Sequence, residues 1–157
     1  MILPYLITFL FWLIIIFSKK HLSLLEMYTT SFFSLYFESI CNIFLDLKYD
    51  YFGYFRKGAD WSILPILFFM YPAVNILFLN FFPFQYSILK KILYIGICSM
   101  ISIMFEWLFL HTSFFYYNGW KLLYSALLYP VIFIILLSNL SLIRMLYKKS
   151  IQQHVHK

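Results

Sequence analysis

Five apolar segments of 17 to 25 residues, separated by short polar or basic connections, constrain this chain more than any other feature. A helix needs about 20 apolar residues to cross the hydrocarbon layer, because a bilayer offers no hydrogen-bond partner to an open backbone. The sequence therefore predicts an all-α fold, a polytopic membrane helix bundle of about five transmembrane helices in one domain, with a flexible polar tail at residues 150–157. The predicted helices are residues 1–17, 27–47, 61–82, 92–110 and 122–146.

The composition excludes an ordinary soluble domain. Hydrophobic residues make up 64% and charged residues 11% of the 157 positions, whereas a soluble domain is about half apolar and a quarter charged. So short a chain cannot hide the excess in a core, because much of its surface stays outside. The net charge of +6 is explained by basic residues that orient the chain in the membrane and attract anionic lipid. We therefore expect the lipid bilayer as partner and no nucleic acid, and leave open membrane protein partners or a homo-oligomer.

The distribution of basic residues predicts an orientation. With the N-terminus outside, the cytoplasmic segments hold eight basic residues and the outer segments four, as the positive-inside rule requires. The eight are Lys19, Lys20, Lys90, Lys91, Arg144, Lys148, Lys149 and Lys157, and the four are Lys48, Arg56, Lys57 and Lys121. The sequence thus predicts a multi-pass protein of the cell (plasma) membrane, N-terminus outside and C-terminus cytoplasmic. The alternative has four spans, with the short first segment or the polar second segment lying at the interface.

Segments two and four share the pattern S-x-x-S-x-x-F-E, at residues 31–38 and 99–106. Each copy leads to a Tyr-x-Gly-aromatic stretch and then to a Tyr-Pro step in the following segment, Tyr71-Pro72 and Tyr129-Pro130. These shared features, in the same order, favour duplication over coincidence. Two crossings per unit leave both copies pointing the same way, so we predict a parallel two-helix repeat of segments 2–3 and 4–5.

Two glutamates lie inside predicted spans, and each must face the bundle, find a partner or contact water, because an acid in hydrocarbon is costly. At 3.6 residues per turn one arc of segment two collects polar residues, and segment four has a matching arc. The arcs consist of Ser31, Ser34, Glu38, Asn42 and Asp46, and of Ser99, Ser102 and Glu106. With one residue each from segments three and five, we predict a central polar cluster of Glu38, Glu106, Asn42, Asn75 and Tyr129.

Three functional interpretations of this cluster stay open. The acids are interhelical hydrogen-bond glue in a structural or accessory subunit, a site for small-molecule or ion binding or transport, or a general acid acting on a lipid or isoprenoid. The sequence favours binding or transport over catalysis and identifies no catalytic residue. Glu106 and His111 are five apart and share no helix face, so we expect no metal site, and no cofactor. Cys41 and Cys98 are predicted to be free buried thiols.

Three stretches carry a resemblance to a known family. They are Tyr-Pro-Ala-Val-Asn-Ile-Leu-Phe-Leu-Asn-Phe-Phe-Pro at 71–83, Phe-Glu-Trp at 105–107 and Tyr-Asn-Gly-Trp-Lys-Leu at 117–122. The chain resembles, over roughly residues 22–148, a family of small uncharacterised multi-pass membrane proteins from Gram-positive spore-forming bacteria. The resemblance implies a bacterial cell membrane and brings no activity. A fainter similarity, to the short membrane domains of carotenoid-type lycopene cyclases, carries the enzyme alternative, although this chain lacks their adjacent pair of acids.

Overall fold

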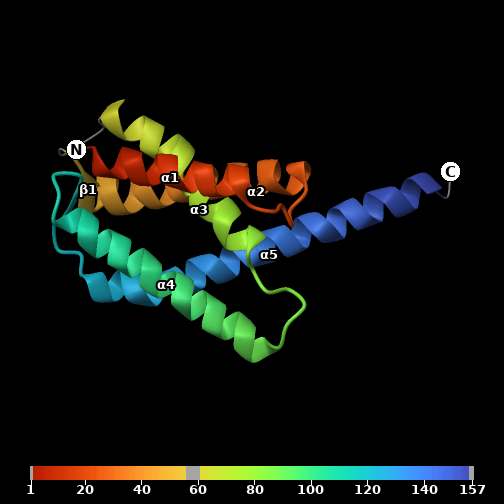
Figure 1. Ribbon diagram of the computed structural model, residues 1–157. Coiled ribbons are helices and arrows are strands. Elements are labelled where there is room, and N and C mark those ends of the chain that lie inside the picture. The colour runs from red at the N-terminus through yellow and green to blue at the C-terminus, as the bar shows by residue number, and fades with distance from the viewer. Residues whose placement is uncertain (1, 56–60, 156–157) are drawn as a thin grey trace.

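The computed structural model describes residues 2–55 and 61–155. Arg56, Lys57 and Lys157 of the charge pattern lie outside these described residues. Five α-helices and two short strands make up the described chain (Figure 1), so the all-α prediction is confirmed. A π-helical segment, η1 (Ile43–Lys48), prolongs α2, and a 3-10 turn, η2 (Trp61–Ile63), leads into α3. The elements are α1 (Leu3–Phe17), α2 (Leu24–Asn42), β1 (Phe52–Tyr54), α3 (Leu64–Asn80), α4 (Ile88–Leu110), β2 (Phe115–Tyr117) and α5 (Leu122–Val155).

The helices overlap the five predicted segments and differ from them at the ends. Helix α2 begins earlier because Ser23 and Glu26 form a capping box, in which the Glu26 N–H donates to Ser23 Oγ (3.2 Å) and the Ser23 N–H to Glu26 Oε2 (2.7 Å). Helix α5 continues to Val155, so most of the predicted polar tail is helical. Pro65 lies in the first turn of α3, where its missing N–H costs no helical hydrogen bond.

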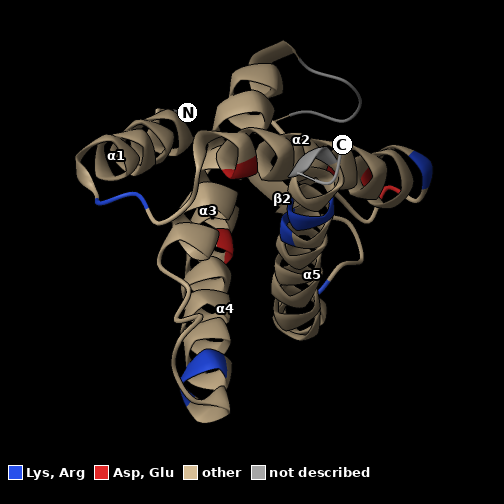
Figure 2. Cartoon of the chain, turned by 90° about the vertical axis from the view of Figure 1, so that its right-hand side faces the viewer, with Lys and Arg blue, Asp and Glu red and all other residues tan. Residues whose placement is uncertain are grey.

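Three helices of the described chain are long and apolar enough to cross a membrane, by length and composition alone. They are Trp61–Asn80, Ile88–Leu110 and Leu122–Gln153. Helix α1 is apolar but shorter, with 15 residues, and polar residues interrupt α2 throughout its length. Lys and Arg are found in the connections, at helix ends and in the final turns of α5 (Figure 2).

The chain runs back and forth, with the N-terminus and β1 at one end and the C-terminus at the other (Figure 1). Helix α1 packs on α3, α2 packs on α3 and α5, and α4 packs on α5. Buried Asn80 fixes the α1–α2 connection to the end of α3. Its Oδ1 accepts from the His21 N–H (2.7 Å), and its Nδ2 donates to the Lys19 carbonyl (2.9 Å).

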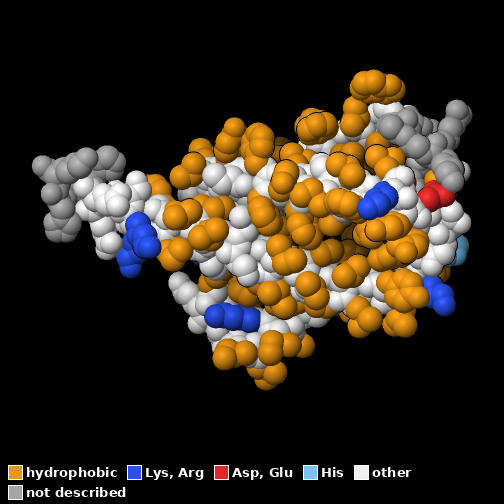
Figure 3. All heavy atoms as spheres, turned by 180° about the vertical axis from the view of Figure 1, so that it is seen from behind, with side chains coloured by type: hydrophobic (Ala, Val, Ile, Leu, Met, Phe, Trp, Pro, Cys, Tyr) orange, Lys and Arg blue, Asp and Glu red, His pale blue; other side chains and the backbone are white. Residues whose placement is uncertain are grey.

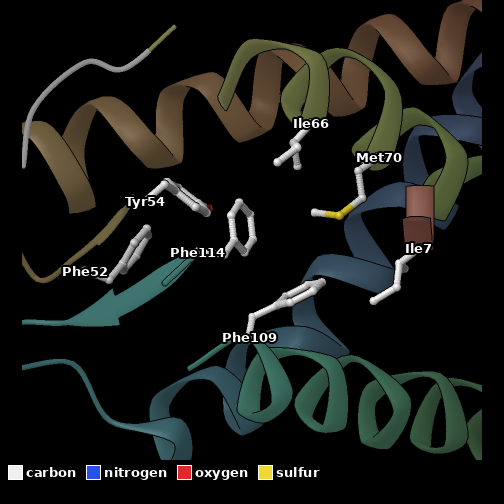
Figure 4. Packing of buried hydrophobic residues seen from close by; sticks show 7 residues of the cluster. All are labelled: Ile7, Phe52, Tyr54, Ile66, Met70, Phe109 and Phe114. Atoms are coloured by element: carbon white, nitrogen blue, oxygen red, sulfur yellow. The ribbon is translucent and has the colours of Figure 1, made fainter. Parts of the chain in front are cut away.

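Strands β1 and β2 pair antiparallel with Gly53 opposite Tyr116, and the sequence does not predict this pair. Beside them lies a hydrophobic cluster with Phe114 at its centre (Figure 4). The Phe114 ring centroid lies 5.4 Å from that of Tyr54 and 5.0 Å from that of Phe109. The cluster consists of Ile7, Phe52, Tyr54, Ile66, Met70, Phe109 and Phe114. A second cluster joins α3 to α5 through Phe78 and Phe133, whose ring centroids are 4.3 Å apart.

Gly53 makes the strand pair testable. A Cβ built at Gly53 would come within 2.6 Å of Tyr116 Cζ, so the ring has to move. We expect Gly53→Ala to destabilise the protein by about 1–3 kcal/mol, the usual range for overpacking. Gly96→Ala is the matched control, because a Cβ there meets nothing within 4 Å. Thermal unfolding of the purified protein measures both, and equal melting temperatures for the two variants would contradict the close strand contact.

Candidate functional site

A cavity of about 670 Å³ lies between α2, α3, α4 and α5. Its walls are mostly apolar, and both hydrophobic clusters contribute to them. This volume falls within the range of small-molecule sites, about 300–1,000 Å³. Figure 3 shows hydrophobic side chains over most of one face of the molecule, with a hollow among them. All five residues of the predicted polar cluster line the cavity: Glu38, Glu106, Asn42, Asn75 and Tyr129.

Glu106, on α4, is buried and accepts three hydrogen bonds from hydroxyl groups. Its Oε1 accepts from Tyr117 Oη (2.5 Å) and Ser125 Oγ (2.7 Å), and its Oε2 accepts from Tyr129 Oη (2.8 Å). Ser125 Oγ in turn accepts from Trp120 Nε1 at 2.8 Å. One carboxylate thus joins α4 to β2 and to two turns of α5.

Glu38, on α2, has a different environment. Its Oε1 accepts from Asn42 Nδ2 at 2.9 Å, one turn further along the helix. The hydroxyls of Tyr54 and Tyr71 lie 2.9 Å apart and contact the Glu38 carboxylate. Glu38 is only partly buried, because its side chain faces the open volume of the cavity. This carboxylate therefore keeps capacity to accept further hydrogen bonds.

Tyr54 of β1 and Tyr117 of β2 are neutral hydroxyl groups of the site. Burial, reinforced by the negative charge of Glu38, raises the pKa of Tyr54 well above its ordinary value. Burial and the hydrogen bond to Glu106 likewise raise the pKa of Tyr117. Tyr54 thus interacts electrostatically with both Glu38 and Glu106.

Two amide oxygens in the cavity wall have no partner among the described residues. Asn75 is 1% exposed; its Nδ2 donates to Thr30 Oγ1 at 3.1 Å, and its Oδ1 has no partner. Asn42 Oδ1 is also buried without a partner. A buried polar atom left unpaired costs about 1–3 kcal/mol, so each of these oxygens requires an explanation.

The predicted polar arc of α2 lines the cavity only in part. Ser34 lines the wall together with Glu38 and Asn42, but Ser31 and Asp46 do not. Asp46 lies in η1, where the wider π-helical turn rotates side chains away from the α-helical arc. Both cysteines are free and line the cavity.

Sequence reasoning missed three hydroxyl groups of the site, those of Tyr54, Tyr71 and Tyr117. The repeat pattern held a signal for all three, because Tyr71 occupies the same Tyr-Pro position as Tyr129, and Tyr54 and Tyr117 lie in the Tyr-x-Gly-aromatic stretches. Nothing in the helical periodicity indicates the two strand tyrosines, because the strand pair brings them to the cavity.

The two acids should respond differently to removal of their charge. In Glu106→Gln the amide nitrogen cannot accept, so one of three hydroxyl donors loses its acceptor. We expect a loss of about 1–3 kcal/mol in the free energy of unfolding. Glu38→Gln keeps an oxygen for Asn42, and the tyrosine hydroxyls that lose an acceptor adjoin the open cavity, so we expect a smaller loss. Thermal unfolding in the same detergent measures both, and a larger loss for Glu38→Gln would reverse these assignments.

Comparison with known proteins gives no match: no family model, no curated protein and no solved structure is significantly similar to the chain. The resemblance to the spore-forming bacterial family and the fainter one to lycopene cyclases therefore stay predictions. The function has to be inferred from the geometry of the cavity.

Proposed function

We propose that this chain is an integral membrane protein that binds or transports a small lipophilic molecule in the cavity between its helices. The main evidence is the cavity of about 670 Å³, which has the Glu38 carboxylate in an otherwise mostly apolar wall. Membrane acids commonly mark ligand or ion pathways, and ligand sites combine apolar walls with a few polar groups that orient the ligand.

The polarity of α2 supports a position within the bilayer. Its buried residues are polar, Thr30 and Ser34, and its outward face is apolar. A surface helix of a soluble protein has the opposite arrangement, so the inverted pattern suits a helix that faces lipid. It favours a span for α2 over a position at the interface. The exposed apolar side chains of this face are Leu25, Tyr28, Phe32, Tyr36 and Ile40.

The surface and the charges support the same proposal. Only 17% of the apolar stretch of α4 is buried, so lipid is the solvent that this helix suits. Because the helices alternate in direction (Figure 1), the described basic residues assigned to the cytoplasm lie in the α1–α2 connection, the first turn of α4 and the second half of α5, at the end opposite the strands (Figure 2). This distribution supports the N-outside, C-inside orientation by the positive-inside rule.

The contacts of the two acids support the proposed repeat of α2–α3 and α4–α5. Glu38 contacts Tyr71, and Glu106 accepts from Tyr129, so each acid meets the tyrosine of the Tyr-Pro step in its own unit. Each acid also contacts a tyrosine of the strand that follows its helix, but Tyr54 and Tyr117 occupy different positions of the Tyr-x-Gly-aromatic stretch. The helices of each unit pack on one another.

A structural role is the second candidate, and the environment of Glu106 favours it. Three hydroxyl donors from β2 and α5 occupy this carboxylate, which is what interhelical glue requires. We therefore assign Glu106 mainly to holding the helices and Glu38 to the ligand. Acid catalysis on a lipid remains the enzyme alternative.

Single cysteines test the topology. In a Cys41→Ser, Cys98→Ser background, we expect Lys121→Cys to react with a membrane-impermeant maleimide on intact cells. Lys149→Cys should react only after permeabilisation, because five spans place the two positions on opposite sides. Both residues are exposed, so access within the protein does not limit the reaction. Labelling of both positions, or of neither, on intact cells would reject the five-span N-outside proposal.

Filling the cavity tests the binding function. Ser102 lines the cavity and donates to the carbonyl four residues earlier, Cys98, at 3.0 Å. Exposed Ser138 makes the same bond to Ile134 at 2.8 Å but faces outward. We expect Ser102→Phe to lose the ability to complement a deletion strain, whereas Ser138→Phe should still complement it. Both proteins should accumulate to the wild-type level.

Glu38→Gln belongs in the same complementation assay, and we expect it to behave as Ser102→Phe does. A lipid analysis of the deletion strain tests the enzyme alternative, because a missing enzyme would leave its lipid or isoprenoid substrate to accumulate. Wild-type phenotypes for both Ser102→Phe and Glu38→Gln would leave the structural role as the function.

A further inference from the structure

We propose that the ligand is a lipophilic amine, with its protonated amino group at Glu38 and its apolar body along the rest of the cavity. This inference rests on the proposed binding function and specifies the chemical class of the ligand. The argument starts from the hydrogen-bonding capacity that the cavity wall leaves unused.

The unused capacity near Glu38 consists of acceptors. Glu38 accepts from one amide and from tyrosine hydroxyls, and a carboxylate has about four acceptor positions. Asn42 Oδ1 and Asn75 Oδ1 have no partner among the described residues. A ligand that satisfies these oxygens has to donate hydrogen bonds.

The orientation of both amides follows from chemistry. Asn42 turns its nitrogen to Glu38, because Glu38 Oε1 is the acceptor of this hydrogen bond. Asn75 turns its nitrogen to Thr30 Oγ1 because the Thr30 hydroxyl already donates to the Glu26 carbonyl at 2.7 Å. In both residues the carbonyl oxygen is therefore the atom that remains without a partner.

The charge of the wall selects a cation. Two acids line the cavity, and no Lys, Arg or His does so among the described residues. A carboxylate or phosphate ligand would meet repulsion from the acids and would bring acceptors to acceptors. A primary ammonium group brings three N–H donors and one positive charge, which match Glu38, Asn42 and Asn75. The rings of Tyr54 and Tyr71 add a favourable surface for a cation.

The remaining volume requires an apolar body. A bare calcium or magnesium ion fills a small part of about 670 Å³ and is usually surrounded by six or more oxygen ligands, whereas this wall is mostly hydrocarbon. Three wall residues of α4 and α5 are also exposed, namely Ile101, Leu128 and Val131. In a bilayer these positions face acyl chains, so a lipophilic ligand can enter sideways from the membrane.

The two natural cysteines supply the assay, because both line the cavity. The full-length protein is placed in phosphatidylcholine nanodiscs, and mass spectrometry follows alkylation of Cys41 and Cys98 by N-ethylmaleimide. The probes share one chain length: dodecylammonium, dodecyltrimethylammonium, dodecanol and dodecanoate, with sodium chloride alone as a fifth sample. We expect dodecylammonium to protect the thiols at the lowest concentration, because it alone combines charge with N–H donors.

Variants locate the head group. Glu38→Gln should raise the dodecylammonium concentration needed for half protection by about tenfold or more, the loss expected for a charged hydrogen bond. Asn75→Leu should raise it as well. The matched control is Asn139→Leu, because Asn139 Oδ1 is also buried without a partner but does not line the cavity. Unchanged melting temperatures establish that each variant is folded.

The outcomes separate the ligand class from the binding function. Equal protection by dodecyltrimethylammonium, better protection by dodecanol or dodecanoate, or protection by sodium ions alone would overturn the amine proposal while leaving the cavity a binding site. No protection by any probe would overturn it too, and the complementation test with Ser102→Phe would then decide the binding function separately.

Discussion

The hydrogen bonds to Glu106 are the interaction on which the arrangement of the second half of the chain depends. Three hydroxyls from β2 and α5 meet one carboxylate on α4. In a nonpolar environment an unpaired carboxylate is costly, so these donors must be in place when α4 packs on α5. Strand β2 has to present Tyr117 to Glu106, and it does so while paired with β1. The acid thereby fixes the strand pair, and the strand pair in turn brings Tyr54 towards Glu38.

The sequence predicted the helices well because a single physical requirement, apolar length, defines them. It predicted the inward position of the five cluster residues because polar residues at helical spacing share a face, although Ser31 and Asp46 of the same arc do not line the cavity. It did not predict the strand pair or the register change at η1. A strand of three residues has too little periodicity to be detected. The wider turn at η1 removes Asp46 from the arc of Glu38 without a sequence signal that helical geometry can use.

The two acids show how related sequence patterns give different environments. Both lie in an S-x-x-S-x-x-F-E octad and both meet a Tyr-Pro tyrosine. The loop after α4 is the shorter one, and it places Tyr117, Trp120 and Ser125 close together over Glu106. The longer connection after α2 leaves Glu38 with Asn42 and the Tyr54–Tyr71 pair, and with an open side. Under the proposed duplication, loop length is what divides the roles between a structural and a ligand-facing carboxylate.

The cavity itself argues against a purely structural role. Helix association in a membrane depends on close packing, and a void forfeits the contacts that its walls would otherwise make. The chain already uses 20 phenylalanines. A phenylalanine in place of a small wall residue such as Ser34 or Ser102 would fill part of the space. A structural cluster also has no use for Asn42 Oδ1 and Asn75 Oδ1, two buried acceptors without partners. Stability alone would fill the void, whereas a ligand that donates hydrogen bonds to Glu38 from within the cavity requires it.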